Sequence, residues 1–191
     1  MEEKDLVLAG GCFWGMEKLF RQAAGVTDLQ VGYAQGKSQA LANYRDVCTG
    51  LTGFREALAL RYDPARLSLK RILFLYYAVI DPTMFHRQGM DLGSQYQTGI
   101  YWSDRETAET VLAVSTMERA ARREFYVELE PLRCFYPAED YHQAYLEKVP
   151  DGYCHIAPAK MADVLGMPWQ ESDYVRPAAE LLADFRRRTG R

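Results

Sequence analysis

The spacing of apolar and polar residues predicts strands and helices that alternate along the chain. A short apolar run over 6–9 indicates a buried strand, and Met16, Leu19 and Phe20 follow it at the spacing of one helix face. Alternation over 56–62 indicates a half-buried strand. The strands predicted in this way are 6–9, 26–33, 56–62, 100–102 and 125–129. The predicted helices are 13–24, 69–80, 104–123, 138–146 and 178–187.

Several predicted helix ends carry capping residues. Ser68 can cap the helix that follows it, and Ser103 with Glu106 forms a capping-box pattern. Gly25 is placed to end the first helix. The segment 81–97 is long and has little periodicity, and connections of this kind are usually either functional or disordered.

The alternation of elements predicts an α+β fold in which helices pack on one mixed sheet. The chain has 191 residues, of which 48% are hydrophobic, and this is enough for one full core. Composition becomes patchier from about residue 159. We therefore expect a main domain at 1–158 and a C-terminal appendage with a short helix at 159–191.

The charge balance narrows the range of partners. The net charge of −3 does not suggest a nucleic acid or an anionic membrane as partner, and no apolar run reaches membrane-spanning length. The acidic start of the chain lacks a secretory pattern, so the sequence favours the cytoplasm. Only three histidines are present, without ligand spacing, and we expect neither a metal nor an organic cofactor.

The four cysteines are Cys12, Cys48, Cys134 and Cys154, and no two of them form a C-x-x-C pair. In a reducing compartment such thiols are either buried and inert or catalytic. Cys12 lies between two glycines and two aromatic residues, at a predicted strand-to-helix turn. There, the helix dipole and the free backbone N–H groups favour a thiolate, which predicts a nucleophile beside an apolar wall.

Four blocks of sequence resemble the A-type peptide methionine sulfoxide reductases and cover roughly 6–155. The blocks are Gly11-Cys12-Phe13-Trp14-Gly15; Val31-Gly32-Tyr33-Ala34 with Tyr44-Arg45-Asp46-Val47-Cys48-Thr49-Gly50, Thr52-Gly53 and Glu56; Arg87-Gln88-Gly89 with Asp91, Gly93, Gln95 and Tyr96; and Phe135, Ala138-Glu139-Asp140-Tyr141-His142-Gln143 and Gly152-Tyr153-Cys154. Their order along the chain is that of the family. The resemblance implies a ferredoxin-like α/β sandwich core with long loops and a C-terminal coil, and a catalytic reductase domain at 1–158.

The resemblance also implies an activity and its partners. It implies thiol-dependent reduction of the S epimer of methionine sulfoxide, free or in proteins, as repair of oxidative damage. Thioredoxin or a similar dithiol would then recycle the enzyme. Attack on a sulfoxide sulfur needs a thiolate, a neutral acid and hydrogen-bond donors to the oxygen in one water-poor pocket. The cysteine would become a sulfenic acid, and a second thiol would convert it to a disulfide.

The same resemblance assigns roles to individual residues. Cys12 would attack, Glu56 would supply the proton, and Cys154 would resolve the sulfenic acid. Tyr44 and Tyr96 would bind the oxygen, because a phenol donates one hydrogen bond and tolerates an apolar wall. The substrate would be held by Phe13, Trp14 and Asp91. The alternation of 56–62 independently puts Glu56 on the apolar side of its strand, where burial would raise its pKa.

The sequence departs from the family pattern before the acid, where Phe54 and Arg55 replace a histidine and a small residue. Neighbouring strand residues point to opposite faces, so we expect Arg55 to lie away from Glu56. No cysteine follows Cys154, which makes Cys12 and Cys154 the simplest redox pair. We interpret Cys48 and Cys134 as structural residues in strand-like segments, although the sequence leaves open whether either could resolve instead.

Two other functions remain open at this point. A cysteine hydrolase would need a histidine base, for which His142 or His155 could serve. A redox sensor would use the Cys12–Cys154 disulfide as its output and would not turn over.

Overall fold

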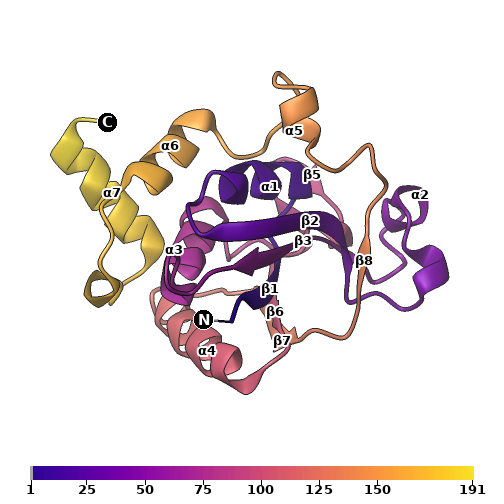
Figure 1. Ribbon diagram of the computed structural model, residues 1–191, viewed down its shortest axis with the longest axis horizontal. Helices are drawn as coiled ribbons and strands as arrows, with labels where there is room; N and C mark the ends of the chain where they lie inside the picture. The colour runs from indigo at the N-terminus through magenta and orange to yellow at the C-terminus, as the bar shows by residue number, and fades with distance from the viewer. Residues whose placement is uncertain (1) are drawn as a thin grey trace.

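A six-stranded mixed sheet forms the centre of the structure (Figure 1). The computed structural model describes residues 2–191. Along the sheet the strands are β7 (Glu128–Pro131), β6 (Gly99–Trp102), β1 (Lys4–Ala9), β3 (Arg55–Tyr62), β2 (Val26–Ala34) and β8 (Phe135–Pro137). The pairs are antiparallel except β6 with β7, which is parallel.

The helices are α1 (Phe13–Arg21), α2 (Tyr44–Val47), α3 (Leu69–Val79), α4 (Arg105–Ala120), α5 (Tyr145–Lys148), α6 (Pro158–Gly166) and α7 (Ala178–Thr189). Three short 3₁₀ turns lie at Gln39–Leu41, Ser94–Tyr96 and Glu171–Asp173. A small hairpin of β4 (Arg87–Gln88) and β5 (Asp91–Leu92) stands apart from the main sheet. An α+β architecture with helices packed on one mixed sheet is therefore confirmed.

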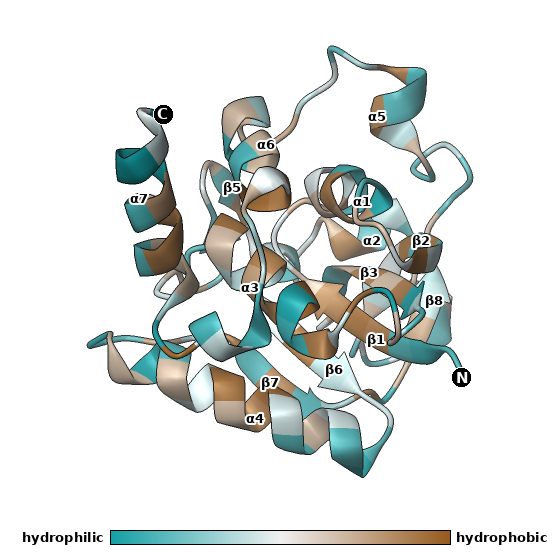
Figure 2. Cartoon of the chain, turned by 60° about the vertical axis from the view of Figure 1, so that its left-hand side comes forward, coloured by the Kyte–Doolittle hydropathy of each residue, from teal (hydrophilic) through white to brown (hydrophobic). Residues whose placement is uncertain are grey.

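One face of the sheet holds the main core. Leu6 and Leu8 of β1 join Leu58 and Leu60 of β3 in an apolar cluster that includes the inner faces of α1, α3 and α4. Figure 2 shows this hydrophobic interior beneath helices whose outer faces are polar. The pairing of Leu8 with Leu58 brings the end of β1 level with the start of β3. The turn after β1 is thereby placed beside Glu56.

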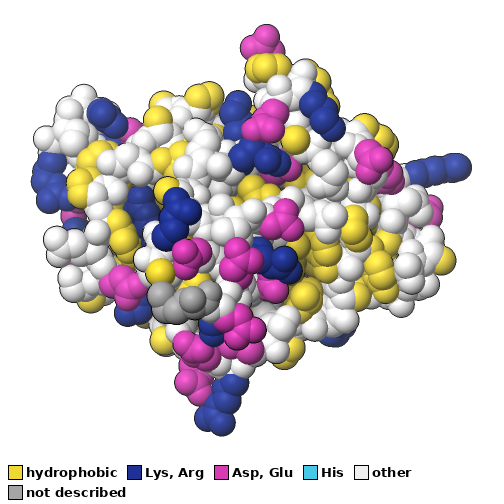
Figure 3. All heavy atoms as spheres, in the orientation of Figure 1, with side chains coloured by type: hydrophobic (Ala, Val, Ile, Leu, Met, Phe, Trp, Pro, Cys, Tyr) yellow, Lys and Arg dark blue, Asp and Glu magenta, His cyan; other side chains and the backbone are white. Residues whose placement is uncertain are grey.

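The opposite face of the sheet is covered more lightly. Val7, Ala57 and Tyr101 form a small second cluster, over which Leu132, just after β7, and Phe135, at the start of β8, pack. On the face of the molecule shown in Figure 3, acidic and basic side chains lie among one another. Across residues 2–191, none of the helices has both the length and the apolar character needed to cross a lipid bilayer.

Several predicted boundaries are wrong for identifiable reasons. The helix predicted from 104 is α4, but its N-cap is Asp104, whose carboxylate accepts from Thr107 N at 2.9 Å, and not Ser103. The strand predicted at 125–129 begins later, at β7, because Tyr126 N donates to Pro82 O in a loop instead of joining the sheet.

The helix predicted at 138–146 is reduced to the single turn of α5. The amide of Gln143 pairs with both backbone groups of Val31 on β2, and this holds the preceding residues in turns. Ala144 then adopts a left-handed φ of 51°, which no α-helix accommodates. The first helix also ends earlier than predicted, at Arg21, although Gly25 does follow with a left-handed φ of 108°.

The C-terminal region contains two helices where the resemblance implies a coil. The sequence predicts α7 but not α6. The guanidinium of Arg71 on α3 donates to three carbonyl groups at the end of α6, those of Val164, Leu165 and Met167. This contact satisfies the last carbonyls of α6, so a tertiary partner supports a helix that has no N-cap hydrogen bond of its own.

Candidate active site

The turn between β1 and α1 carries Cys12 as the N-cap residue of the helix. Gly11 has a φ of 82°, a left-handed conformation that favours glycine and lets the chain reverse sharply before the cysteine. The side chain of Cys12 is only 6% exposed. The predicted strand-to-helix setting is therefore present.

A small cavity of about 120 Å³ opens above this turn. It brings together residues from five separate parts of the chain: Cys12, Phe13, Trp14, Tyr44, Glu56, Asp91, Tyr96 and Tyr153. Seven of these are residues that the sequence singles out as a site. The eighth, Tyr153, is a functional candidate that the sequence reasoning missed, although its neighbour Cys154 could have drawn attention to it.

Glu56 is 2% exposed and points from β3 into the cavity. Its Oε2 accepts a hydrogen bond from Phe13 N at 3.1 Å. Burial raises the pKa of Glu56 to about 8, with a smaller contribution from the charge of Asp91, while the bond from Phe13 N opposes the shift. The carboxyl group is therefore mainly protonated at neutral pH, as a proton donor must be.

Arg55 lies on the other face of β3, as the alternation predicts. Its guanidinium binds Glu128 of β7 at 2.7 Å, and Tyr101 donates to the same carboxylate at 2.6 Å. Glu128, itself held by Tyr101, thus keeps Arg55 away from the cavity. The cation consequently does not oppose the raised pKa of Glu56.

The expectation that the helix N-terminus holds Cys12 as a thiolate is not met. Burial raises the pKa of the Cys12 thiol well above its ordinary value of 9.0, and the charge of Glu56 acts in the same direction. The backbone N–H groups of Trp14 and Gly15 at the helix N-terminus lower the pKa, but by less. The helix dipole is present, but desolvation outweighs it in the substrate-free state.

Tyr44 and Tyr96 place two phenol groups in the cavity. Burial raises the pKa of both far above the ordinary value, so each keeps its proton and remains a hydrogen-bond donor. Glu139 holds Tyr44 in place, because its Oε1 accepts from Tyr44 N at 2.8 Å and its Oε2 from Tyr33 at 2.7 Å. Glu139 lies in the fourth sequence block, but its role depends on a contact across 95 residues.

An aromatic wall forms the apolar side of the cavity. The indole of Trp14 stacks on Tyr145 with 3.9 Å between the ring centroids, and its Nε1 donates to His142 Nδ1 at 3.2 Å. The ring of Phe13 lies 5.1 Å from His142. His142 is therefore a neutral acceptor at Nδ1, and burial lowers its pKa.

Cys154 lies outside the cavity, on the loop between α5 and α6. Its thiol donates to Ile156 O at 3.2 Å, and its sulfur would lie 3.3 Å from a Cβ on Gly15. Gly15 belongs to the first turn of α1, the turn that presents Cys12. Both thiols are free, so the structure corresponds to the reduced state.

The other two cysteines are not in strands, contrary to the sequence interpretation. Cys48 is exposed at the C-terminal end of α2, and Cys134 is half-buried just before β8, where its thiol faces Gly36 O at 3.7 Å. Neither of them lines the cavity.

The arrangement does not fit a cysteine hydrolase. Among residues 2–191, no hydrogen bond joins a histidine to Cys12: His142 accepts from Trp14, and His155 bonds to Gly10 O. In the described part of the chain, no three metal-ligating side chains gather where they could hold a metal ion. The chemistry present is therefore that of a thiol, a neutral carboxyl group and two phenols.

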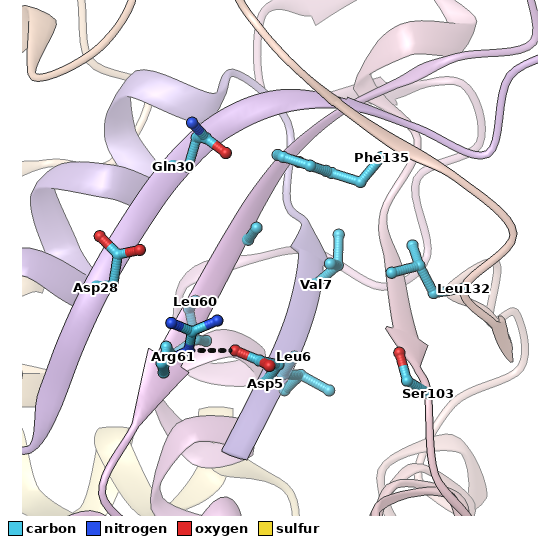
Figure 4. Close-up of a pocket in the computed structure, with 11 residues that line it drawn as sticks. Asp5, Leu6, Val7, Asp28, Gln30, Leu60, Arg61, Ser103, Leu132 and Phe135 are labelled. Atoms are coloured by element: carbon cyan, nitrogen blue, oxygen red, sulfur yellow. Dashed lines mark hydrogen bonds and ion pairs between the residues drawn. The ribbon is translucent and has the colours of Figure 1, made fainter. Parts of the chain in front are cut away.

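A larger hollow of about 290 Å³ lies on the opposite face of the sheet (Figure 4). Val7, Leu132 and Phe135 line it, and an ion pair of Asp5 with Arg61 closes one end. It contains neither a thiol nor a buried carboxyl group. The smaller cavity at Cys12 is accordingly the chemical candidate.

The chain is similar in sequence and in fold to known proteins. A family model described as Peptide methionine sulfoxide reductase matches residues 4–172. The chain is 44% identical over 154 residues to a peptide methionine sulfoxide reductase MsrA of Clostridium botulinum, which covers 80% of this chain and 98% of the relative. Its fold is similar to that of reduced Mxr1 from Saccharomyces cerevisiae, with a TM-score of 0.77 and 31% identity over 82% of this chain and 92% of that one.

A second structure of Mxr1, solved in complex with Trx2, is also similar in fold. Its TM-score is 0.54, with 22% identity over 75% of this chain and 85% of that chain. At this level of identity the likeness concerns the fold alone.

Proposed function

Because the chain belongs to the peptide methionine sulfoxide reductase family, we propose that the cavity at Cys12 is the place where it reduces methionine sulfoxide. The chain is an oxidoreductase of that family, and its product is methionine. One observation carries the assignment: a thiol, a protonated carboxyl group and two phenols converge on one small cavity with an aromatic wall.

The first step joins Cys12 to the substrate. The sulfur of Cys12 attacks the sulfoxide sulfur while Glu56 gives its proton to the oxygen, and Tyr44 and Tyr96 donate hydrogen bonds to that oxygen. Cys12 gives its own proton to the same oxygen as the S–S bond forms, so the oxygen can leave as water and no free thiolate is needed before the substrate binds. That water adds to the sulfur of Cys12, the S–S bond breaks, and methionine leaves as Glu56 takes back a proton, so that Cys12 is left as a sulfenic acid.

The apolar wall would hold the rest of the substrate. Phe13 and Trp14 present faces suited to a methyl group on sulfur, and Asp91 with Tyr153 forms the polar edge. Burial and the neighbouring Asp91 raise the pKa of Tyr153 to about 12, so it also remains a donor. We assign the S epimer, free or in oxidised proteins, on the family resemblance.

Cys154 would then resolve the sulfenic acid. Its thiol displaces the oxygen as water and forms a disulfide with Cys12, and thioredoxin or a similar dithiol reduces that disulfide. The position of Cys154 over the first turn of α1 supports this role. Mxr1, which is 31% identical to this chain in its reduced structure, has also been solved in complex with Trx2, and this supports a thioredoxin as the partner.

Three broader assignments stay proposals. A ferredoxin-like core is supported by the order β1-α1-β2-β3-α3-β6 and by the neighbouring positions β6-β1-β3-β2 in the sheet. The division into a catalytic domain at 1–158 and an appendage at 159–191 places α7 and all but the first residue of α6 in the appendage, which the packing of both helices on α3 ties to the domain. A cytoplasmic location is supported by four free cysteines, which a reducing compartment favours.

Replacement of Cys154 by serine tests the scheme. The variant should form about one methionine per enzyme and then stall with thioredoxin, because no thiol can release the sulfenic acid. Cys48→Ser and Cys134→Ser are matched controls and should turn over like the wild type. Methionine per enzyme, measured with a sulfoxide peptide and thioredoxin, distinguishes them. Sustained turnover by Cys154→Ser would assign the resolving role to another thiol, and stalling of the wild type would instead favour a redox sensor.

A further inference from the structure

The loop between α5 and α6 wraps three consecutive side chains around the nucleophile turn. Tyr153 lines the cavity, and Cys154 places its sulfur 3.3 Å from the Cβ position of Gly15. The ring of His155 also approaches the Cβ position of Gly15, and its Nδ1 lies 2.8 Å from that position. The reaction described above uses Tyr153 and Cys154 but leaves His155 without a role.

His155 makes one hydrogen bond between this loop and the turn. Its Nε2 lies 2.9 Å from Gly10 O, two residues before Cys12. A carbonyl oxygen only accepts, so Nε2 carries the hydrogen. The Nδ1 atom is buried without a partner. A hydrogen on Nδ1 as well would therefore be buried without an acceptor, which favours the neutral ring. Burial lowers the pKa of His155, with Asp91 acting against the shift and Lys160 in the same direction.

The glycines of the turn leave room for this ring. Gly15 lies inside α1, where glycine costs about 1 kcal/mol relative to alanine. An alanine methyl there would meet the ring of His155 at 2.8 Å, closer than a real contact allows. A Cβ on Gly11 would likewise lie 3.3 Å from His155 Nε2. The close approach of the loop therefore explains why glycine, which is unfavourable inside a helix, stands at position 15.

We propose that His155 is a positioning residue for the resolving step, which pins the loop to the nucleophile turn so that Cys154 stays within reach of Cys12. The inference rests on the proposed role of Cys154. Cys12 and Gly15 are three residues apart at the start of α1 and therefore lie on one side of the helix. A disulfide requires Cβ atoms about 3.5–4.5 Å apart, and a loop held at residue 155 needs to move only around residue 154 to reach this geometry.

The step itself balances without a further reactant. Cys154 loses its proton, and its electron pair attacks the sulfur of the Cys12 sulfenic acid. The S–O bond breaks, and the hydroxide takes up the released proton and leaves as water. Cys12 is reduced and Cys154 is oxidised as the S–S bond forms. His155 takes no part in the bonds that form and break, and its role is to hold the loop in place.

Two amide substitutions differ only in reach and therefore test the anchor. The side-chain N–H of glutamine can extend to Gly10 O as Nε2 does, whereas that of asparagine is too short. His155→Asn should form methionine in the first turnover at close to the wild-type rate but form the disulfide about 10-fold or more slowly. His155→Gln should restore most of the rate of disulfide formation, and Asp151→Ala, an exposed change in the same loop, should have no effect.

The measurement is a single turnover, quenched over time. Methionine reports the first step, a dimedone adduct reports the sulfenic acid, and mass spectrometry reports the Cys12–Cys154 disulfide. The inference would be overturned if His155→Asn formed the disulfide at the wild-type rate, or if His155→Gln formed it equally slowly. It would also be overturned if His155→Asn slowed both steps equally. If His155→Asn does not fold, His155→Leu, which fills much of the same space without a hydrogen-bond donor, should slow the disulfide in the same way. A wild type that forms methionine but no such disulfide would instead contradict the assignment of Cys154.

Discussion

At the scale of single residues, burial decides the chemistry more than charge does. Glu56 is protonated because it is buried, and Cys12 is held as a thiol for the same reason. The alternation along β3 correctly predicts that Glu56 is inside and that Arg55 points away. The state of Cys12 could not be predicted, because the helix dipole is visible in the sequence but the depth of burial depends on the whole cavity.

A buried acid of this kind makes stability depend on pH. The pKa of Glu56 rises from 4.5 to about 8 on folding, so between these values the folded state binds more protons than the unfolded state. The stability that the protonated Glu56 contributes to the folded state is fully present below pH 4.5 and is lost as the pH rises through about 8. Glu56→Gln should therefore gain stability relative to the wild type by several kcal/mol from about pH 5 to about pH 8.

Urea unfolding across this pH range measures the difference. Glu124→Gln, an exposed change of the same type, is the control and should follow the wild-type pH dependence. If the free energy of unfolding depended on pH in the same way for Glu56→Gln and the wild type, Glu56 would be shown to titrate at its ordinary pKa.

At the scale of elements, local patterns predict which elements exist but not all of their boundaries. The Ser68 cap is confirmed, because its side chain accepts from Arg71 N at 3.3 Å. The boundaries fail where a distant group replaces a local bond, as with Gln143 on Val31. The loop 81–97 is ordered by its hairpin and supplies Asp91 and Tyr96 to the cavity, a convergence that no local pattern reveals.

The N-cap of α4 is Asp104 and not its neighbour Ser103. Asp104 accepts from both the backbone N–H and the hydroxyl group of Thr107, whereas Ser103 makes no cap bond. Asp104→Ala should lower the free energy of unfolding by about 1 kcal/mol, and Ser103→Ala should change it by less than about 0.5 kcal/mol. Urea unfolding of the two variants compares them directly. A larger loss for Ser103→Ala would restore the capping box that the sequence suggests.

At the scale of the whole molecule, a buried carboxylate adds to the contact of Arg71 with α6 in attaching the C-terminal region. Glu118 of α4 is fully buried, and its Oε1 accepts from the hydroxyl of Tyr174 at 2.8 Å and from Ala178 N at 2.7 Å. Arg122 pairs with its other oxygen at 2.9 Å. The sequence predicts α7 from its own pattern but gives no sign of this contact, because Glu118 resembles an ordinary exposed residue of an amphipathic helix.

Removal of one hydroxyl group tests this attachment. Tyr174→Phe leaves the carboxylate with one donor fewer, and we expect it to lower the free energy of unfolding by roughly 1–3 kcal/mol. Tyr141→Phe, at an exposed tyrosine, should have little effect. The first-turnover rate of Tyr174→Phe should stay at the wild-type value, because Tyr174 does not line the cavity. Unchanged stability would show that Glu118 is satisfied without Tyr174.

The rate of the first turnover in Glu56→Gln tests the central mechanism most directly. Rapid-quench measurement of methionine at neutral pH, under anaerobic conditions and with one epimer of a sulfoxide peptide, isolates the step in which Cys12 attacks. An amide cannot deliver a proton to the oxygen, so we expect methionine formation to slow by about 100-fold or more, while Glu124→Gln retains the wild-type rate. A wild-type rate in Glu56→Gln would contradict the assignment of Glu56 as the proton donor and, with it, the reason for the buried acid beside Cys12.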